Sequence, residues 1–230
     1  MINRIRDYTK KEPSKDAHRI LIICEGNDTE PRYFEFFKGL SPRLDVIPIP
    51  SEDGKADPIK LKEWAIDNLI DDPKEDFDYC QGDTVWFVVD TDEWEKQGKI
   101  KTLRDFCHLQ NEAFKNKYDE CKSYDSWLVA QSKPCFEIWE YYHVFEAKPD
   151  SKEVEAYSTF KEYVNAVIKG GFDFAKMPVE IINAIKNAKE NFSLDEDGSL
   201  SLYATEVFRL AEEILPFVKR DIDRMRNKMQ

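Results

Sequence analysis

Three features are missing from this chain of 230 residues: closely paired cysteines, long apolar runs and an excess of basic residues. None of the five cysteines is spaced as CxxC, and Cys107-His108 lacks a second pair at ligand spacing, so a structural zinc site is not expected. The odd number of cysteines favours a reducing compartment. No apolar run approaches the roughly 20 residues that cross a bilayer, and residues 1–7 contain no apolar signal core. We therefore expect a cytoplasmic protein with no membrane partner.

The charge balance is strongly acidic, with 46 Asp and Glu against 34 Lys and Arg and a net charge of −12. This argues against broad, nonspecific binding of nucleic acid, because such binding depends on Lys and Arg that neutralise phosphates. It leaves room for a small basic patch, a metal ion that bridges phosphates, or a basic partner. A hydrophobic content of 41% is enough for a sizeable core. The length fits one large domain, or a core with an added segment.

Short apolar runs alternate with helical patterns, which is typical of an α/β fold with a parallel sheet flanked by helices. The runs predict strands at 19–24, 45–49, 84–89 and 126–131. Helical patterns lie at 98–118, 135–145, 158–169, 178–191 and 203–219, and strands disappear after about residue 150. We expect an N-terminal arm at 1–17, an α/β core at 18–149 and a helical C-terminal extension at 150–230 that packs on the core.

Carboxylates stand directly after two of the expected strands. Glu25-Gly26 follows the first strand, and Asp90-Thr91-Asp92 follows the strand at 84–89. The carboxyl ends of parallel strands share one edge of the sheet, where ligands bind. Asp90 and Asp92 point to the same side if the chain stays extended. Three carboxylates that meet there would repel one another without a cation, and oxygen ligands favour Mg²⁺ or Mn²⁺. Solvated strand-end acids are the plain alternative.

Other polar residues lie close to these strand ends. Glu30 is either a first-turn carboxylate favoured by the helix dipole, a supporting group or a ligand to a second metal. Ser132, with free amides at an expected helix start, can hold a phosphate, and Lys133 can neutralise charge on it. Glu137 lies one turn further and can face the same edge. His143 can donate to an acid or a phosphate, or simply pack. For Ser132, Lys133 and Glu137 the plain alternatives are a capping serine, a solvated lysine and a surface glutamate.

At these positions the chain resembles the RloB family, whose fold resembles the Toprim domain of topoisomerases, primases and OLD-type nucleases. The blocks that carry the resemblance are Ile22-Ile23-Cys24-Glu25-Gly26 with Thr29-Glu30-Pro31, Val88-Val89-Asp90-Thr91-Asp92-Glu93, Ser132-Lys133-Pro134-Cys135-Phe136-Glu137 with His143, and Ala204-Thr205-Glu206-Val207. The resemblance implies a Toprim-like core with Glu25 in the place of the Toprim glutamate. It also implies that Asp90 and Asp92 are the metal-binding pair.

The resemblance further implies metal-dependent cleavage of nucleic acid that disables an infected bacterial cell, beside an ABC- or AAA-type ATPase. We therefore expect a Mg²⁺- or Mn²⁺-dependent nuclease with Glu25, Lys133 and Glu137 as catalytic candidates. One alternative is a noncatalytic metal-binding subunit. The other is a haloacid-dehalogenase-like phosphatase with Asp90 as nucleophile, although Trp94 stands where that pattern has Thr or Val. The sequence leaves open whether the substrate is DNA or RNA, whether one metal ion or two are used, and which acid is the general base. It also leaves open whether the chain forms a homo-oligomer.

Overall fold

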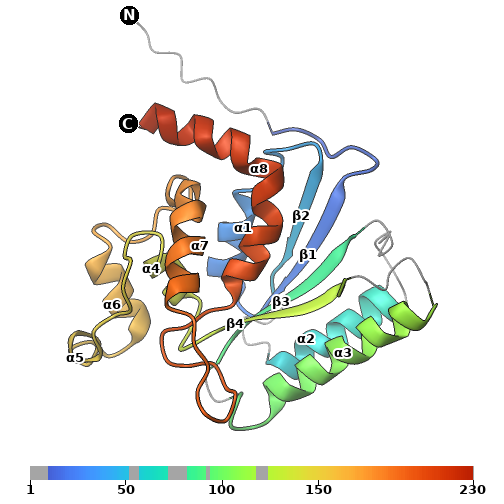
Figure 1. The fold of residues 1–230 in the computed structure, drawn as a ribbon, viewed down its shortest axis with the longest axis horizontal. Coiled ribbons are helices and arrows are strands. Elements are labelled where there is room, and N and C mark those ends of the chain that lie inside the picture. The colour runs from blue at the N-terminus through green and yellow to red at the C-terminus, as the bar shows by residue number, and fades with distance from the viewer. Residues whose placement is uncertain (1–9, 52–56, 72–81, 92–93, 118–123, 230) are drawn as a thin grey trace, which may run out of the picture.

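A parallel β-sheet lies at the centre of the molecule (Figure 1). The computed structural model describes residues 10–51, 57–71, 82–91, 94–117 and 124–229. Within these ranges the sheet has four strands in the order β2-β1-β3-β4, all paired in parallel. The strands are β1 (His18–Cys24), β2 (Leu44–Ile49), β3 (Thr84–Asp90) and β4 (Trp127–Ser132). The expected α/β fold is confirmed, and Pro48 lies in an edge strand, where its missing N–H is tolerated.

Helices cover both faces of this sheet (Figure 1). On one face lie α2 (Pro58–Ala65), its π-helical continuation η1 (Ile66–Asp71) and α3 (Lys99–Lys117). On the other lie α1 (Thr29–Glu35), α4 (Glu137–Tyr141), α6 (Phe160–Val167), α7 (Ile181–Glu190) and α8 (Val207–Met229). The described residues also contain two shorter helices, α5 (Ser151–Val154) and the 3₁₀ helix η4 (Met177–Glu180).

Both faces of the sheet are covered by helices, which explains why the central strands β1 and β3 are apolar over most of their length. In β1, Ile20 and Ile22 belong to the core under α1 and α8, whereas Leu21 and Ile23 belong to the core under α2 and α3. Successive side chains of a strand point to opposite faces, so a strand covered on both sides shows no polar alternation. This continuous apolar pattern is why the sequence locates the strands to within a residue or so.

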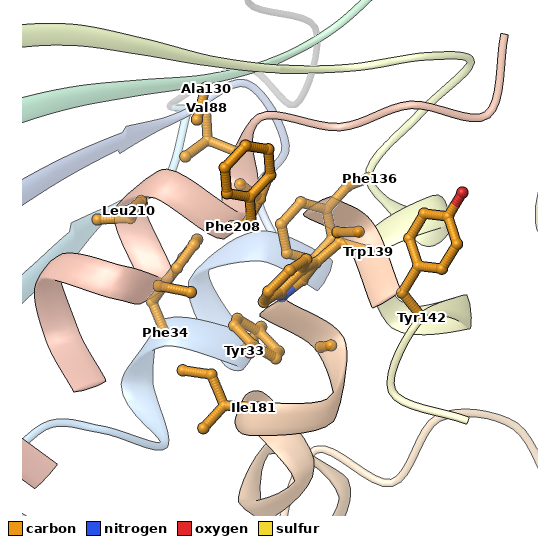
Figure 2. Close-up of a cluster of buried hydrophobic side chains, with 14 of the residues drawn as sticks. Tyr33, Phe34, Val88, Ala130, Phe136, Trp139, Tyr142, Ile181, Phe208 and Leu210 are labelled. Carbon is orange, nitrogen blue, oxygen red and sulfur yellow. The ribbon is translucent and has the colours of Figure 1, made fainter. Parts of the chain in front are cut away.

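The larger core joins the sheet to the C-terminal helices. Figure 2 shows Tyr33 and Phe34 of α1 packed with Trp139 of α4, Ile181 of α7 and Phe208 of α8. Aromatic rings meet mostly edge to face around Tyr33. The helical segment after residue 150 therefore shares one hydrophobic core with the α/β part. The division into domains at residue 149 stays a prediction.

Glu213 fixes α8 to the sheet. Its carboxylate accepts hydrogen bonds from Thr84 Oγ1 at 2.6 Å and Trp86 Nε1 at 2.8 Å, and it lies 2.8 Å from His18 Nε2. The contacts with β1 and β3 hold one face of α8 against the middle of the sheet. No helix in the described residues is long and apolar enough to cross a membrane.

Two helix boundaries differ from the sequence prediction. The helix expected at 135–145 is only the five residues of α4, and the helix expected at 203–219 is α8, which begins at Val207 and continues through Pro216 to Met229. The later start of α8 follows from backbone pairing with β4, because Glu206 N–H donates to Gln131 O at 2.8 Å. Just before the helix, Thr205 forms an antiparallel bridge with Ser132 of β4, and Tyr203 has a φ of 62°, which is not helical.

Candidate functional site

The sheet reverses its winding direction between β1 and β3, and two of the expected acids lie at this point. Glu25 follows β1, and its N–H donates to Val88 O of β3 at 3.0 Å. Asp90 ends β3, and its N–H donates to Glu25 Oε2 at 2.9 Å. Ligands of open α/β sheets bind beyond the strand ends at such a switch point. The structure thus brings Glu25 and Asp90 together. Asp92 lies outside the described residues, so a site of all three acids stays a prediction.

The half-buried carboxylate of Glu25 is held at both oxygens. Trp94 donates its indole N–H to Glu25 Oε1 at 2.7 Å, opposite the bond from Asp90 N–H to Oε2. The ammonium of Lys99 lies 4.3 Å from the centre of the Trp94 ring, close enough for a cation–π contact. These contacts fix the orientation of the Glu25 carboxylate at the end of the sheet.

Three further carboxylates lie buried around Asp90. Glu30 comes from the first turn of α1, and Glu137 and Glu140 come from one face of α4; their residues are 5%, 6% and 3% exposed. We call Glu25, Glu30, Asp90, Glu137 and Glu140 the acidic cluster. Acids so seldom lie in the interior without partners that their gathering needs an electrostatic explanation.

The cluster carries more negative charge than its surroundings compensate. Burial, followed by the charges of Glu30, Glu25 and Glu137, raises the pKa of Asp90 well above its usual value. Burial, followed by the charges of Glu137 and Glu30, raises the pKa of Glu140 to about 8. Burial also raises the pKa of Glu30, with Glu137 adding to the effect. Each of these shifts favours the neutral form of the carboxyl group, as expected where acids are buried together with too little positive charge nearby.

Two oxygens of the cluster are left without a hydrogen-bond partner in the described structure, Glu137 Oε2 and Glu140 Oε1, although both are buried. Buried polar atoms are usually paired. The other oxygen of Glu137 lies 3.0 Å from Lys161 Nζ of α6, and Asp90 Oδ1 accepts the Phe136 N–H at 2.8 Å. Unpaired carboxylate oxygens beside other buried acids are the type of donor that a hard divalent cation prefers.

A complete ligand set is not preformed in the described residues. No group of three or more His, Cys, Asp or Glu side chains among them is arranged to hold a metal ion. Mg²⁺ commonly takes only one or two protein carboxylates, while water and substrate phosphate fill its other positions. The acidic cluster is therefore compatible with a metal ion of this kind, and the described residues would supply part of its coordination shell.

Gly26 allows Glu30 to approach the strand end. A Cβ atom at position 26 would lie 2.3 Å from Glu30 Oε2, so only glycine leaves room for this carboxylate. In the structure the group that approaches Gly26 is a carboxylate of the acidic cluster.

Comparison with known families identifies the chain at this point. A model of the RloB-like protein family matches residues 20–214, most of the chain. The chain belongs to the RloB-like family. No curated protein and no solved structure matches it. The matched region runs from β1 into α8, so it contains the whole acidic cluster and Lys161.

Ser132 and His143 lie in the interior and not beside a ligand in this RloB-like site. Ser132, considered as a residue that holds a phosphate, ends β4, is fully buried and pairs its hydroxyl with Thr205 Oγ1 at 2.8 Å. For His143 the structure agrees with the packing alternative, because its ring nitrogens lie 3.1 Å from Tyr33 Oη and 2.9 Å from Trp139 O. Burial lowers the pKa of His143 to about 4, so the ring packs as a neutral group.

The expected helix-start amides and Lys133 also lie differently from the prediction. The Phe136 N–H already donates to Asp90 Oδ1, and α4 has only five residues. In the described structure this short helix therefore does not present the expected set of free N–H groups to a phosphate. Lys133 Nζ lies 3.4 Å from Glu95 Oε2 and 3.6 Å from Asp195 Oδ2. Both of these carboxylates lie outside the acidic cluster.

Sequence reasoning missed three residues of the RloB-like site: Trp94, Glu140 and Lys161. Glu140 was recoverable, because it stands three residues after Glu137 and so shares its helix face. Trp94 served only as an argument against a phosphatase. Lys161 gave no signal, because its place beside Glu137 depends on how the C-terminal helices fold over the core.

Proposed function

We propose that this RloB-like chain is a divalent-metal-dependent nuclease that hydrolyses phosphodiester bonds in DNA or RNA. The observation that supports this most is the acidic cluster itself. It gathers buried carboxylates at the topological switch point, raises the pKa of several of them and leaves two oxygens unpaired. Phosphodiester hydrolysis uses such carboxylates to hold Mg²⁺ or Mn²⁺ beside a phosphate.

Glu25 and Asp90 are the described residues that would hold the metal at the strand ends, with Asp92 as the further expected ligand. A bound divalent ion would polarise a phosphoryl oxygen and lower the pKa of a coordinated water. Glu30 and Glu137 lie next to Asp90 and can support this ion or a second one. The chain orients these groups through backbone and indole N–H donors.

Specific contacts of the chain prepare this site. The Asp90 amide and the Trp94 indole hold both oxygens of Glu25, and the Phe136 amide holds Asp90 Oδ1. Donors fixed in advance need no reorganisation during the reaction, which is the usual source of electrostatic catalysis. Glu140, with its pKa of about 8, holds a proton at neutral pH in the metal-free chain.

The test is cleavage of single- and double-stranded DNA and of RNA by the purified chain with Mg²⁺, Mn²⁺ or a chelator. Glu25→Gln and Asp90→Asn should each lower the rate at least about 100-fold, because both lose a metal-binding charge. Glu155→Gln, an exposed position on the helical extension, is the matched control and should keep full activity. Undiminished cleavage by folded Glu25→Gln protein would contradict the proposal.

We propose further that the activity belongs to a bacterial anti-phage system and is gated by an ABC- or AAA-type ATPase partner. The net charge of −12 supports gating, because such a chain attracts nucleic acid poorly by itself. The chain is expressed in bacteria alone and together with an ATPase encoded beside it. If the ATPase gates the nuclease, only the condition in which the nuclease is released should be toxic to the cells. Asp90→Asn should abolish that toxicity.

A noncatalytic metal-binding subunit is the second candidate, favoured by the incomplete ligand set of the described residues. In that case the chain would bind Mn²⁺ and its partner, and Glu25→Gln would leave cellular toxicity unchanged. The same cleavage assay separates the two candidates.

A further inference from the structure

Lys161 of α6 is the cation in contact with the acidic cluster in the described structure. Its Nζ lies 3.0 Å from Glu137 Oε1. Its charge also acts on Glu30, Asp90 and Glu140, where it opposes the rise of their pKa values. One side chain from the helical extension thus contacts Glu137 directly and acts electrostatically on three further carboxylates of the cluster.

Lys161 lies at the boundary between these buried acids and solvent. Its side chain is 57% exposed, whereas that of Glu137 is 8% exposed. Burial works against its charge, but Glu137 and Asp90 raise the pKa of Lys161, so the ammonium stays protonated at neutral pH. A phosphate that approaches the buried carboxylates from this side would meet the ammonium before it meets the acids.

A purely structural role explains the arrangement less well. The single ammonium pairs with one oxygen of Glu137, while Glu137 Oε2 and Glu140 Oε1 remain unpaired. Lys161 therefore leaves part of the cluster open for another cation. Lysine is a compact point charge on a flexible stem, and it can turn from a carboxylate to a nearby phosphate oxygen.

We propose that Lys161 is a catalytic residue whose ammonium contacts a non-bridging oxygen of the bound phosphate and stabilises the charge that develops there during hydrolysis. This inference rests on the proposed nuclease function. It assigns to the helical extension a role that the sequence suggested for Lys133, which instead pairs with Glu95 and Asp195.

The experiment uses bis(p-nitrophenyl) phosphate, a small phosphodiester that probes the reaction centre without a nucleic-acid groove, at saturating Mn²⁺. Lys161→Gln should lower kcat about 100-fold or more, as expected for loss of one preorganised electrostatic group, and change KM less than about threefold. Lys161→Arg should restore at least a tenth of kcat. Lys152→Gln, an exposed lysine of α5, is the matched control and should match the wild type.

A second measurement separates catalysis from structural support. Mn²⁺ binding, followed by the electron paramagnetic resonance of free Mn²⁺, should be at least as tight in Lys161→Gln as in the wild type, because a competing positive charge is gone. A merely structural lysine would alter stability or metal binding and leave kcat of the folded protein unchanged. If Lys161→Gln does not fold, Lys161→Gln in a Glu137→Gln background replaces it, compared with Glu137→Gln alone.

Three results would overturn the inference. Lys161→Gln could keep kcat within threefold of the wild type, Lys161→Arg could be as inactive as Lys161→Gln, or the double variant could equal Glu137→Gln. In each case a wild type that still hydrolyses the probe leaves the proposed nuclease function standing. A wild type that cleaves neither this probe nor nucleic acid refutes the nuclease function, and the role of Lys161 falls with it.

Discussion

Replacing Gly26 with alanine probes the packing of the acidic cluster at its tightest point. The new Cβ would lie 2.3 Å from Glu30 Oε2 and 2.9 Å from both Glu30 Cδ and Oε1, whereas ordinary contacts begin near 3.4 Å. Glu30 is 5% exposed, so its carboxylate cannot simply swing into solvent. We expect it to withdraw by about 1 Å.

The size of the effect follows from the steric overlap that the new Cβ creates in a packed site. Forcing an extra carbon atom into a well-packed interior typically costs about 1–3 kcal/mol. Gly26→Ala should therefore lower the free energy of unfolding by about 2 kcal/mol, which for a chain of this length lowers Tm by about 4–8 °C. Gly26 does not have a positive φ, so the backbone itself accepts alanine.

The assay is urea and thermal unfolding of four proteins: wild type, Gly26→Ala, Glu30→Ala and the double variant. Once Glu30 is shortened, the alanine at position 26 meets no carboxylate. It should then be neutral or stabilise by up to about 1 kcal/mol, because alanine restricts the unfolded chain. The cycle should give a coupling energy of about 2 kcal/mol or more between the two positions.

Two results would refute this reasoning. Gly26→Ala could change the free energy of unfolding by less than about 0.5 kcal/mol, the usual range for a substitution that disturbs nothing. It could also cost as much in the Glu30→Ala background as in the wild type, which would show that the strain lies elsewhere than in the contact with Glu30.

Three further predictions concern α8, His143 and the metal. Glu213→Ala should lower the free energy of unfolding in urea by about 3 kcal/mol, because it leaves Thr84 Oγ1 and Trp86 Nε1 without their acceptor; a loss below about 1 kcal/mol would contradict this anchor. Because the pKa of His143 is about 4 in the folded chain and about 6.5 unfolded, the unfolded chain binds the extra proton between these values and the wild type loses stability as pH falls. The free energy of unfolding of the wild type should therefore fall by about 3 kcal/mol relative to that of His143→Gln between pH 7 and pH 4. A difference that does not change with pH would show that protonation of His143 is not the cause. For the acidic cluster the sign is opposite: Glu140 keeps its proton up to about pH 8 when folded but loses it near 4.5 when unfolded, so its contribution falls as pH rises through that window. A fixed Mn²⁺ concentration, set at 100 times the Kd for pH 8, should stabilise the chain by about 2.7 kcal/mol at pH 8. The same concentration should stabilise it by much less at pH 5.5, where protons compete for the carboxylates. An equal rise in Tm at both pH values would count against binding at these acids.

The central strands β1 and β3 were predictable because they are buried on both faces and a carboxylate stands at the end of each apolar run. The continuous apolar runs before Glu25 and Asp90 define β1 and β3 without any knowledge of the partner strands. The ends of α4 and α8 were not predictable in the same way. They depend on contacts between distant segments, such as the hydrogen bond from Glu206 N–H to Gln131 O.

The candidate site was predictable where it depends on the sheet and not where it depends on helix packing. Glu25 and Asp90 adjoin because neighbouring parallel strands end at one edge. Glu137 was named from the sequence, whereas Glu140 was missed although it lies three residues further along α4 on the same helix face. The pairing of Lys161 with Glu137 joins segments that no local pattern relates, so only the folded chain reveals it.

The proposed nuclease depends on a divalent metal ion bound to the acidic cluster through Asp90 and Glu25. Anomalous scattering from a crystal of the wild-type chain soaked in Mn²⁺ locates such an ion. We expect an anomalous peak in direct contact with a carboxylate oxygen of Asp90, beside Glu25, and no such peak in Asp90→Asn. A saturating soak with no peak at any member of the acidic cluster would contradict the proposed metal site.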